Sequence, residues 1–457
     1  MITPHPEVSE LERQTIKRVT RRLVPFLILL FVVAFLDRNN VGFAALRMND
    51  DIGISQTIFG LGAGIFFLGY FLFEVPSNVL LHRFGARVWL ARIMVTWGII
   101  AGLMGLLQTA GHFITLRFLL GLAEAGFFPG VIYLLSLWFP ARYRARMIAT
   151  FYLGVPIAQV LGAPLSVGLM QLGDVVGVVG WRLMYIAEAV PAIILGVVCF
   201  FYLTDRPADA HWLSDEQRTW LMNTLDAEER AKPLVVGRQP SKAQMVRKAL
   251  GSRQVWLLAL VYFGITSGSN AMNFFMPTVL ASFRASFGLE IGLMQNGLIT
   301  AIPYALAAVA MIWWSRRSDR LQERHWHAGG AAILAAVSIA VALLINQPWI
   351  IVIGFVLLAI GVYSAINVFW AVPGQVLTGV GAAAGIGLIN SIGNLSGFTG
   401  PYLTGYLFNL TGSYTPGFLI IAALVGAGGL AMVLMPRNKV VLTDTPVPPV
   451  KAVGGKA

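Results

Sequence analysis

Residues 22–46 read RLVPFLILLFVVAFLDRNNVGFAAL, an apolar run that carries the adjacent charges Asp37 and Arg38 beyond its midpoint. A helix needs about 20 predominantly apolar residues to cross a bilayer, and this run is long enough. A charge within the hydrocarbon costs at least about 2.5 kcal/mol on insertion scales. The stretch therefore predicts a membrane-spanning helix whose charges face the protein interior.

The composition of the whole chain agrees with this interpretation. Of its 457 residues, 57% are hydrophobic and only 12% are charged, whereas soluble domains carry about 25% charged residues. The first residues are polar and the first apolar run is long, so we expect no cleaved signal peptide. The single cysteine, Cys199, lies in an apolar segment and is expected to be inert packing.

Twelve such segments predict an all-α polytopic membrane protein with 12 transmembrane helices in two pseudo-symmetric six-helix bundles. The predicted spans are 22–46, 55–81, 88–108, 112–136, 146–170, 181–203, 255–281, 291–314, 328–346, 349–372, 378–409 and 414–435. The predicted domains are an N-terminal segment 1–21, a bundle 22–204, a linker 205–254, a bundle 255–436 and a disordered tail 437–457.

Basic residues predict the orientation, because short cytoplasmic loops are enriched in Lys and Arg. Of the 33 Lys and Arg residues, Arg47, Arg182 and Arg284 fall in loops predicted outside, and Arg38 and Arg117 lie in spans. The others fall in the N-terminal segment, the linker, the tail or the loops on that same side. Both termini are therefore predicted to be cytoplasmic. This distribution also argues against nucleic-acid binding as the reason for the net charge of +12.

The linker is too short for a catalytic domain and is predicted to hold two short amphipathic helices. Ser214-Asp215-Glu216-Gln217 and Ser241-Lys242-Ala243-Gln244 each match a capping box. The run Gly60-Leu61-Gly62-Ala63-Gly64 lies within a span with no strand before it, so it indicates close helix packing and not a nucleotide loop.

Two further charges lie in the fourth predicted span. Arg117, Gly121 and Glu124 share one helix face, and the small Gly121 is expected to leave room between the charged side chains. Asp37 and Glu124 fall at similar depths, so we expect the four charges to form one layer. One alternative is a pair of buried salt bridges that only join the two spans.

The favoured alternative gives these charges a transport role. Arginine binds carboxylates with two hydrogen bonds, so Arg38 and Arg117 are candidates for an anionic substrate. Asp37 and Glu124 are candidates for proton exchange. Burial disfavours the ionised form of a carboxyl group, whereas a nearby arginine favours it, so substrate binding can shift the balance. Five histidines fall in loops, tails or the linker, and His112 stands at the very start of a span, so metal or histidine chemistry is not expected. For Glu188, capping of a kink at Pro191 and contact with substrate are equally compatible with the sequence.

The second six spans carry no ionisable residue that we place deep in the membrane. Their polar candidates for substrate recognition are amides and a phenol: Asn270, Asn273, Tyr363, Asn367, Asn390 and Asn394. Gln159 in the fifth span is a similar candidate. Amides offer donors and acceptors suited to hydroxyl groups. For each of them, ordinary hydrogen bonding between helices is the alternative.

Four motifs resemble the major facilitator superfamily, and more narrowly its anion:cation symporter family of organic-acid permeases. The likeness covers about residues 18–436. The motifs are Asp37-Arg38-Asn39-Asn40, Val75-Pro76-Ser77-Asn78 with His82-Arg83-Phe84-Gly85-Ala86-Arg87, Arg117 to Gly130 containing Glu124-Ala125-Gly126, and Gly385 to Asn394. Ser318-Asp319-Arg320 repeats the loop motif in the second half and supports the division into two bundles.

The resemblance implies proton coupling at Asp37 and Glu124, and substrate or ion-pair contacts at Arg38 and Arg117. Its loop motifs imply gating roles for Arg83, Arg87, Asp319 and Arg320. Glu74, near the inner end of the second span, is expected to form a gating or loop-facing ion pair with a basic neighbour.

Together these features predict a multi-pass transporter of the cytoplasmic (inner) membrane that imports a small organic anion by proton symport. Sugar acids, hydroxy-dicarboxylates and aromatic carboxylates all fit. An anion exchanger or uniporter without proton coupling is the alternative within the class, and a transporter-like sensor is the alternative outside it. An enzyme is not expected, because no nucleophile and base pair is visible. We expect a monomer without cofactor or metal.

Overall fold

The computed structural model describes residues 9–230, 242–378, 382–436 and 440–441. The helices of the first half are α1 (Glu10–Asp51), α2 (Gln56–Phe84), α3 (Ala86–Leu103), η1 (Met104–Leu106), α4 (Ala110–Glu124), α5 (Phe127–Trp138), α6 (Ala141–Tyr152), α7 (Gly154–Val176) and α8 (Gly180–Tyr202). The linker forms η2 (Pro207–Asp209), α9 (Asp215–Arg230) and α10 (Lys242–Gly251).

The second half forms α11 (Arg253–Ala281), α12 (Phe283–Phe287), α13 (Leu293–Leu321), α14 (His325–Ile345), α15 (Pro348–Phe369), α16 (Pro373–Val376), α17 (Ala382–Asn394), α18 (Ser396–Thr411) and α19 (Thr415–Leu434). Strand β1 (Leu377–Thr378) pairs in parallel with β2 (Val440–Val441). Apart from these two residues, the predicted tail lies outside the described part of the chain.

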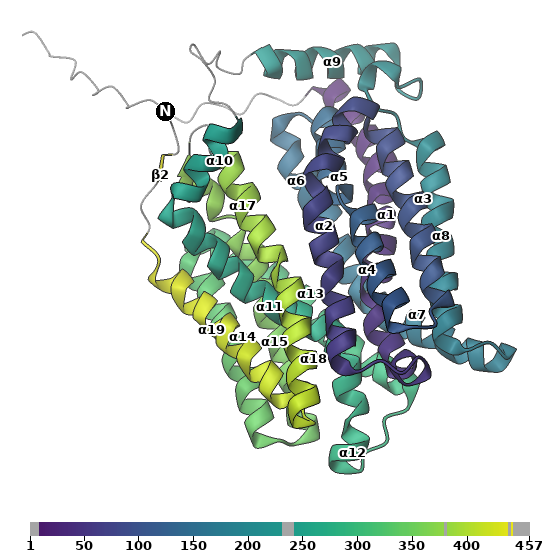
Figure 1. The fold of residues 1–457 in the computed structure, drawn as a ribbon. Coiled ribbons are helices and arrows are strands. Elements are labelled where there is room, and N and C mark those ends of the chain that lie inside the picture. The colour runs from purple at the N-terminus through teal and green to yellow at the C-terminus, as the bar shows by residue number, and fades with distance from the viewer. Residues whose placement is uncertain (1–8, 231–241, 379–381, 437–439, 442–457) are drawn as a thin grey trace, which may run out of the picture.

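The helices form two bundles that lie side by side (Figure 1). We call α1–α8 the N-terminal bundle and α11–α19 the C-terminal bundle. Eleven helical segments of the described chain are long and apolar enough to cross a membrane. The remaining predicted span, the eleventh (378–409), is formed by α17 and α18, which are separated at Leu395. The predicted all-α fold of twelve spans is therefore confirmed.

The fourth span is not the continuous helix that its sequence predicts. Helix α4 ends at Glu124, and α5 starts at Phe127 after Gly126, whose φ of 89° is left-handed. The Ser77 hydroxyl donates to the carbonyl of Ala125 (2.6 Å), and a Cβ on Gly126 would lie 2.1 Å from that hydroxyl. Only glycine fits here. The break places Glu124 at a helix end inside the bundle.

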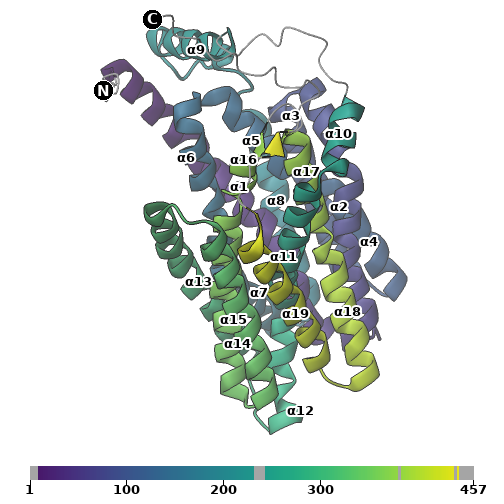
Figure 2. The ribbon, with the colours of Figure 1, turned by 90° about the vertical axis from the view of Figure 1, so that its left-hand side faces the viewer.

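We call the end of the molecule that carries α9 and the start of α1 the linker end, and the opposite end the distal end (Figures 1 and 2). Near the distal end the bundles pack without side chains between the backbones. A Cβ added to Gly60 would lie 2.3 Å from the carbonyl oxygen of Pro401, and one added to Gly405 would lie 2.0 Å from that of Gln56. The expectation that the Gly60–Gly64 run serves close helix packing is confirmed.

Toward the linker end the same face of α2 has no partner helix. Phe71 and Val75 share the face of Gly60 by helical periodicity, yet they are 38% and 71% exposed. On α17, a Cβ added to Gly387 would meet nothing within 4 Å. The bundles are thus closed on each other at the distal end and separated at the linker end.

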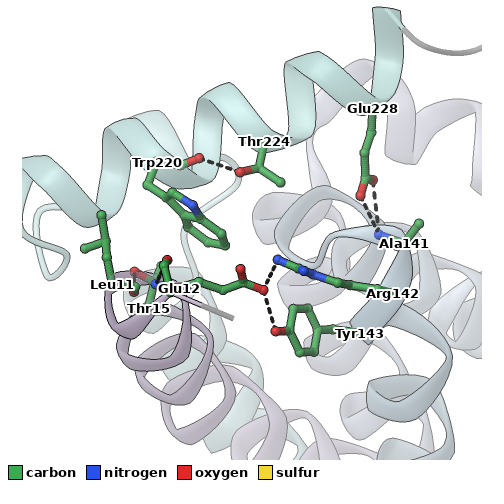
Figure 3. Close-up of polar contacts among 10 residues, drawn as sticks. Leu11, Glu12, Thr15, Ala141, Arg142, Tyr143, Trp220, Thr224 and Glu228 are labelled. Atoms are coloured by element: carbon green, nitrogen blue, oxygen red, sulfur yellow. Dashed lines mark hydrogen bonds and ion pairs between the residues drawn. The ribbon is translucent and has the colours of Figure 1, made fainter. Parts of the chain in front are cut away.

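The linker helix α9 is attached to the N-terminal bundle (Figure 3). Glu228 accepts hydrogen bonds from the backbone N–H of Ala141 (3.0 and 3.1 Å). Nearby, Glu12 forms an ion pair with Arg142 and accepts a hydrogen bond from the Tyr143 hydroxyl (2.5 Å). These contacts hold the start of α1, the start of α6 and α9 together as one unit.

The first predicted capping box in the linker is confirmed. The Gln217 N–H donates to the Ser214 hydroxyl oxygen, and the Ser214 N–H donates to the Gln217 side chain, both at 3.3 Å. The second box begins at Ser241, which lies outside the described residues.

Candidate functional site

Arg38 on α1 forms an ion pair with Glu124 at the end of α4. The Glu124 side chain is 3% exposed, and that of Arg38 is 20% exposed. The guanidinium also lies over the rings of Phe35, Phe66 and Tyr70, at 5.0, 5.2 and 5.5 Å from their centroids. Aromatic faces attract a cation, so this arginine is fixed among three rings with a single carboxylate partner.

Asp37 and Arg117 are buried close to this pair, but neither forms an ion pair with a described residue. The indole N–H of Trp97 donates to an Asp37 carboxylate oxygen at 2.8 Å. Arg117 is fully buried and donates to the carbonyl oxygens of Gly62 (3.2 Å) and Ala63 (3.3 Å) on α2. Of the two salt bridges that the structural alternative expects, one forms within the described residues, between Arg38 and Glu124.

From its position on the helix face, Gly121 is expected to leave room between the charged side chains, but the structure gives it another role. A Cβ at this position would lie 2.0 Å from the carbonyl oxygen of Phe66. Its small size instead lets α4 approach the backbone of α2. That close approach is what brings the Arg117 side chain to the carbonyl groups of α2.

A third carboxyl group belongs to the same region. Glu188 on α8 is 4% exposed. It accepts hydrogen bonds from the Asn40 amide (2.8 Å) and from the Ser166 hydroxyl (2.7 Å). Sequence reasoning missed Asn40, Ser166 and Trp97. Of these, Asn40 carried a signal, because it lies three residues after Asp37 and so on the same side of α1.

A second polar cluster joins the two bundles. Asn273 on α11 accepts hydrogen bonds from the Tyr304 hydroxyl (2.7 Å), the Gln159 amide (3.2 Å) and, more distantly, the Tyr363 hydroxyl (3.4 Å). Gln159 in turn accepts from the Asn39 amide (3.3 Å) and donates to Tyr363 (3.2 Å). The sequence predicts Gln159, Asn273 and Tyr363 as candidates for substrate recognition. It gives no indication of Asn39 and Tyr304.

Asn40 and Ser166, the partners of Glu188, and part of the second polar cluster border one small cavity between the bundles, whereas none of the four charged residues lines it. Its walls include Asn39, Asn40, Gln159, Ser166, Asn273, Thr300 and Tyr304. The cavity has room for about one water molecule. An organic acid therefore needs the bundles to move apart before it can occupy this place.

The other nominated amides lie elsewhere. Asn270 donates to the Ser396 hydroxyl (3.0 Å), which joins α11 to α18. Asn367 is exposed and donates to the Ser315 hydroxyl (2.9 Å). Asn390 and Asn394 are half-buried, and their side chains form no hydrogen bond with any part of the chain that the structure describes. None of the four borders the central cavity.

The nominated gating residues form few ion pairs in this conformation. The backbone N–H of Arg87 donates to Asp205 (2.8 Å), and its guanidinium lies 3.8 Å from the same carboxylate. Asp319 pairs with Arg324. Within the described residues, Arg83, Arg320 and Glu74 form no ion pair. Arg38, whose charge acts on Glu74, is paired with Glu124 instead.

Several named proteins are similar to this chain over nearly its whole length. It is 46% identical over 94% of its length to a protein of Agrobacterium vitis named putative tartrate transporter, of which it covers 96%. It is 35% identical over 96% of its length to the putative metabolite transport protein NicT of Pseudomonas putida, with 98% of that protein covered. A quinolone resistance transporter of Acinetobacter baumannii is 40% identical, with 91% of this chain and 94% of that protein covered.

Solved structures share the fold. One is the inward open conformation of the xylose transporter XylE from E. coli, with a TM-score of 0.69, 12% identity, and 90% and 95% of the two chains covered. Another is a bacterial homolog to the human lysosomal transporter Spinster, with a TM-score of 0.67, 17% identity, and 91% and 93% covered. The sequence profile of the Major Facilitator Superfamily matches residues 27–400. The chain thus belongs to the major facilitator superfamily, a family of membrane transporters and not of enzymes.

Proposed function

We propose that this protein imports a small organic anion together with protons across the cytoplasmic membrane. The observation that carries the proposal is the arrangement of the four buried charges. Arg38 has one carboxylate partner, whereas Asp37 and Arg117 have none within the described residues. Buried charges without partners are costly. Their cost is explained if they serve the substrate and its co-transported protons.

The Arg38–Glu124 pair supplies a way to couple proton uptake to anion binding. While Glu124 is ionised, it occupies the guanidinium of Arg38. Once Glu124 takes up a proton, Arg38 is free to bind a carboxylate of the substrate with two hydrogen bonds. Arg117, on the same helix as Glu124, adds a second positive charge. Proton and anion then bind together, which is the requirement for symport.

The neutral cluster that joins the two bundles supports recognition of hydroxyl groups. Asn273, Gln159, Tyr304 and Tyr363 offer both donors and acceptors around the cavity. Two relatives named putative tartrate transporter are 46% and 45% identical to this chain. Hydroxy-dicarboxylates such as tartrate are therefore the first substrates to test, ahead of sugar acids and aromatic carboxylates.

The conformation fits the release step of such a cycle. The linker end carries the basic loops and is the cytoplasmic side by the positive-inside pattern. Since the bundles are separated at that end and closed at the distal end, the central site faces the cytoplasm. Each net positive charge carried inward gains about 2.3 kcal/mol per 100 mV of inside-negative potential. Excess protons can thus drive accumulation of the anion.

The test is uptake into proteoliposomes with an imposed pH gradient, using tartrate, gluconate and benzoate while the internal pH is recorded. We expect tartrate uptake with inward proton movement, and loss of both in Asp37→Asn and Arg117→Ala. Asp174→Asn is the control, because it changes an exposed carboxylate far from the cavity. Uptake that ignores the gradient would establish an exchanger or uniporter. Binding without uptake would establish a sensor.

A further inference from the structure

We propose that Glu188 is a third protonation site of the transport cycle, and that it takes its proton from the distal side when the two bundles separate there. The inference rests on the proposed proton symport, and it adds a residue on a helix that contributes none of the four charges discussed above. It starts from the contacts of the Glu188 carboxyl group and from its position close to the distal contact between the bundles.

Both oxygens of Glu188 are held by neutral groups. The Asn40 amide binds one oxygen and the Ser166 hydroxyl binds the other. No cation lies within ion-pair distance among the described residues. Burying an ionised carboxylate without a cation is very unfavourable. The buried group is therefore a neutral acid that carries one proton, with its O–H donating to the Ser166 hydroxyl oxygen and its carbonyl oxygen accepting from Asn40.

The other titratable groups around Glu188 come from three helices. Asp37 on α1 and Tyr185 on α8 itself lie within electrostatic range of it. On α4, Arg117 faces Tyr185, and Glu124 faces Asp37. Helices α3 and α7 contribute the uncharged Trp97 and Ser166. The acids of this region are thus close enough that a proton on one affects the others.

The position of Glu188 along the membrane normal is given by Asn40. Asn40 follows Asp37 by three residues on α1, which corresponds to about 4.5 Å toward the distal end. Gly42 is two residues farther, and a Cβ on it would lie 2.8 Å from the carbonyl oxygen of Asn273 on α11. Glu188 therefore lies nearer the distal end than Asp37, close to the level of this contact between the two bundles. It is the outermost of the three buried carboxyls.

Asn40 and Ser166 also border the central cavity, so they form a wall between Glu188 and the substrate position. When the Gly42–Asn273 contact opens, water from the distal side reaches this wall, and Glu188 gains a proton. When the contact closes, the acid is enclosed in its neutral form. The proton leaves once water from the linker end enters the cavity, which in this conformation has room for only about one water molecule.

The experiment compares Glu188→Gln with Ser166→Ala. Glutamine has the shape of glutamic acid and hydrogen bonds with both neighbours but cannot exchange a proton. Ser166→Ala removes one hydrogen bond and keeps the ionisable group. In proteoliposomes, the reversal potential of tartrate flux gives the number of protons moved per tartrate. We expect one proton fewer in Glu188→Gln, and an unchanged ratio in Ser166→Ala whatever its rate. An unchanged ratio in Glu188→Gln would overturn the inference.

A second measurement covers the case in which Glu188→Gln does not transport. The infrared difference spectrum of purified protein between acid and alkaline pH reports the C=O stretch of protonated carboxyl groups. We expect a titrating band in the wild type that is missing in Glu188→Gln. Identical difference spectra would show that Glu188 is a permanent hydrogen-bond acceptor. If the wild type moves tartrate without protons, the symport proposal fails, while the infrared result still decides whether Glu188 titrates.

Discussion

In the N-terminal bundle the buried polar side chains include Asp37, Arg117, Glu124 and Glu188, and Arg38 is mostly buried beside them. In the C-terminal bundle, the buried polar side chains within the described residues are hydroxyls, amides and imidazoles without an acidic, Lys or Arg side chain. The two bundles share one arrangement of helices. In the proposed cycle, one bundle therefore carries the charge and the other recognises the hydroxyl groups of the substrate.

Placing the buried charges in one bundle has a physical advantage. Desolvated charges need partners at fixed distances, and the helices of one bundle keep their spacing while the bundles move against each other. The neutral bundle is free to form and break hydrogen bonds across the cavity, each worth only about 0.5–1.5 kcal/mol net. The contact between the bundles can then open without separating an ion pair.

Breaking the Arg38–Glu124 pair should have the largest effect. Arg38→Ala leaves Glu124 buried without its cation, which we expect to cost about 3–5 kcal/mol of stability and to abolish tartrate uptake. The double variant Arg38→Leu with Glu124→Leu should recover the stability and still not transport. Thermal unfolding of the purified protein and uptake into proteoliposomes check both statements.

The matched control for this prediction is an exposed pair in the same bundle. Arg47 and Asp174 lie 2.6 Å apart with side chains 41% and 47% exposed. Asp174→Asn should cost at most about 1 kcal/mol. Full transport by the double leucine variant would show that the charged bundle is structural and would remove the contrast between the bundles.

A substitution at the contact between the two bundles is expected to have an effect of intermediate size. Gly60→Ala places a methyl group 2.3 Å from the carbonyl oxygen of Pro401. Overpacking costs about 1–3 kcal/mol, so the conformation closed at the distal end should become about fivefold rarer or more. The readout is the rate at which a thiol reagent labels Val75→Cys, an exposed position on the separated part of α2; native Cys199 is fully buried.

Gly387→Ala is the control for the labelling experiment, because nothing lies within 4 Å of the added methyl group. Its labelling rate at position 75 should equal that of the parent protein. Equal rates in the Gly60→Ala protein as well would contradict the assignment of this contact as the distal closure.

The smallest effect is expected in the neutral bundle. Asn273→Ala leaves the donors of Gln159, Tyr304 and Tyr363 without their shared acceptor. Losing about 1.4 kcal/mol of substrate binding should raise the KM for tartrate about tenfold, with a smaller change in the maximal rate. Asn273→Asp keeps an acceptor but adds a negative charge to the neutral bundle.

For Asn273→Asp we expect a higher KM than for Asn273→Ala, because the new carboxylate repels the anion. Initial rates at varied tartrate concentration measure both variants. A KM below that of the alanine variant would indicate that the C-terminal bundle tolerates charge, and that its neutrality is not part of recognition.

Sequence reasoning identified some of these contacts and not others. Gln159, Asn273 and Tyr363 were nominated as polar residues in apolar spans, and they do meet. Asn390 and Asn394 share a helix face in the same manner, yet they do not reach the cavity. A one-helix pattern shows which residues share a face, whereas the rotation of that face is set by packing against neighbouring helices.

The fold, the division into two bundles and the presence of buried charge were determined by the sequence alone. They follow from local properties, namely the length of each apolar run, the basic loops between runs and single charged residues within them. The partner of each charge was decided by the tertiary structure. Asn40 and Glu188 are 148 positions apart and Arg38 and Glu124 are 86 apart, so no spacing rule links them. Only the packing of α1 against α8, and of α4 against α2 and α3 in the same bundle, brings these groups within hydrogen-bond distance.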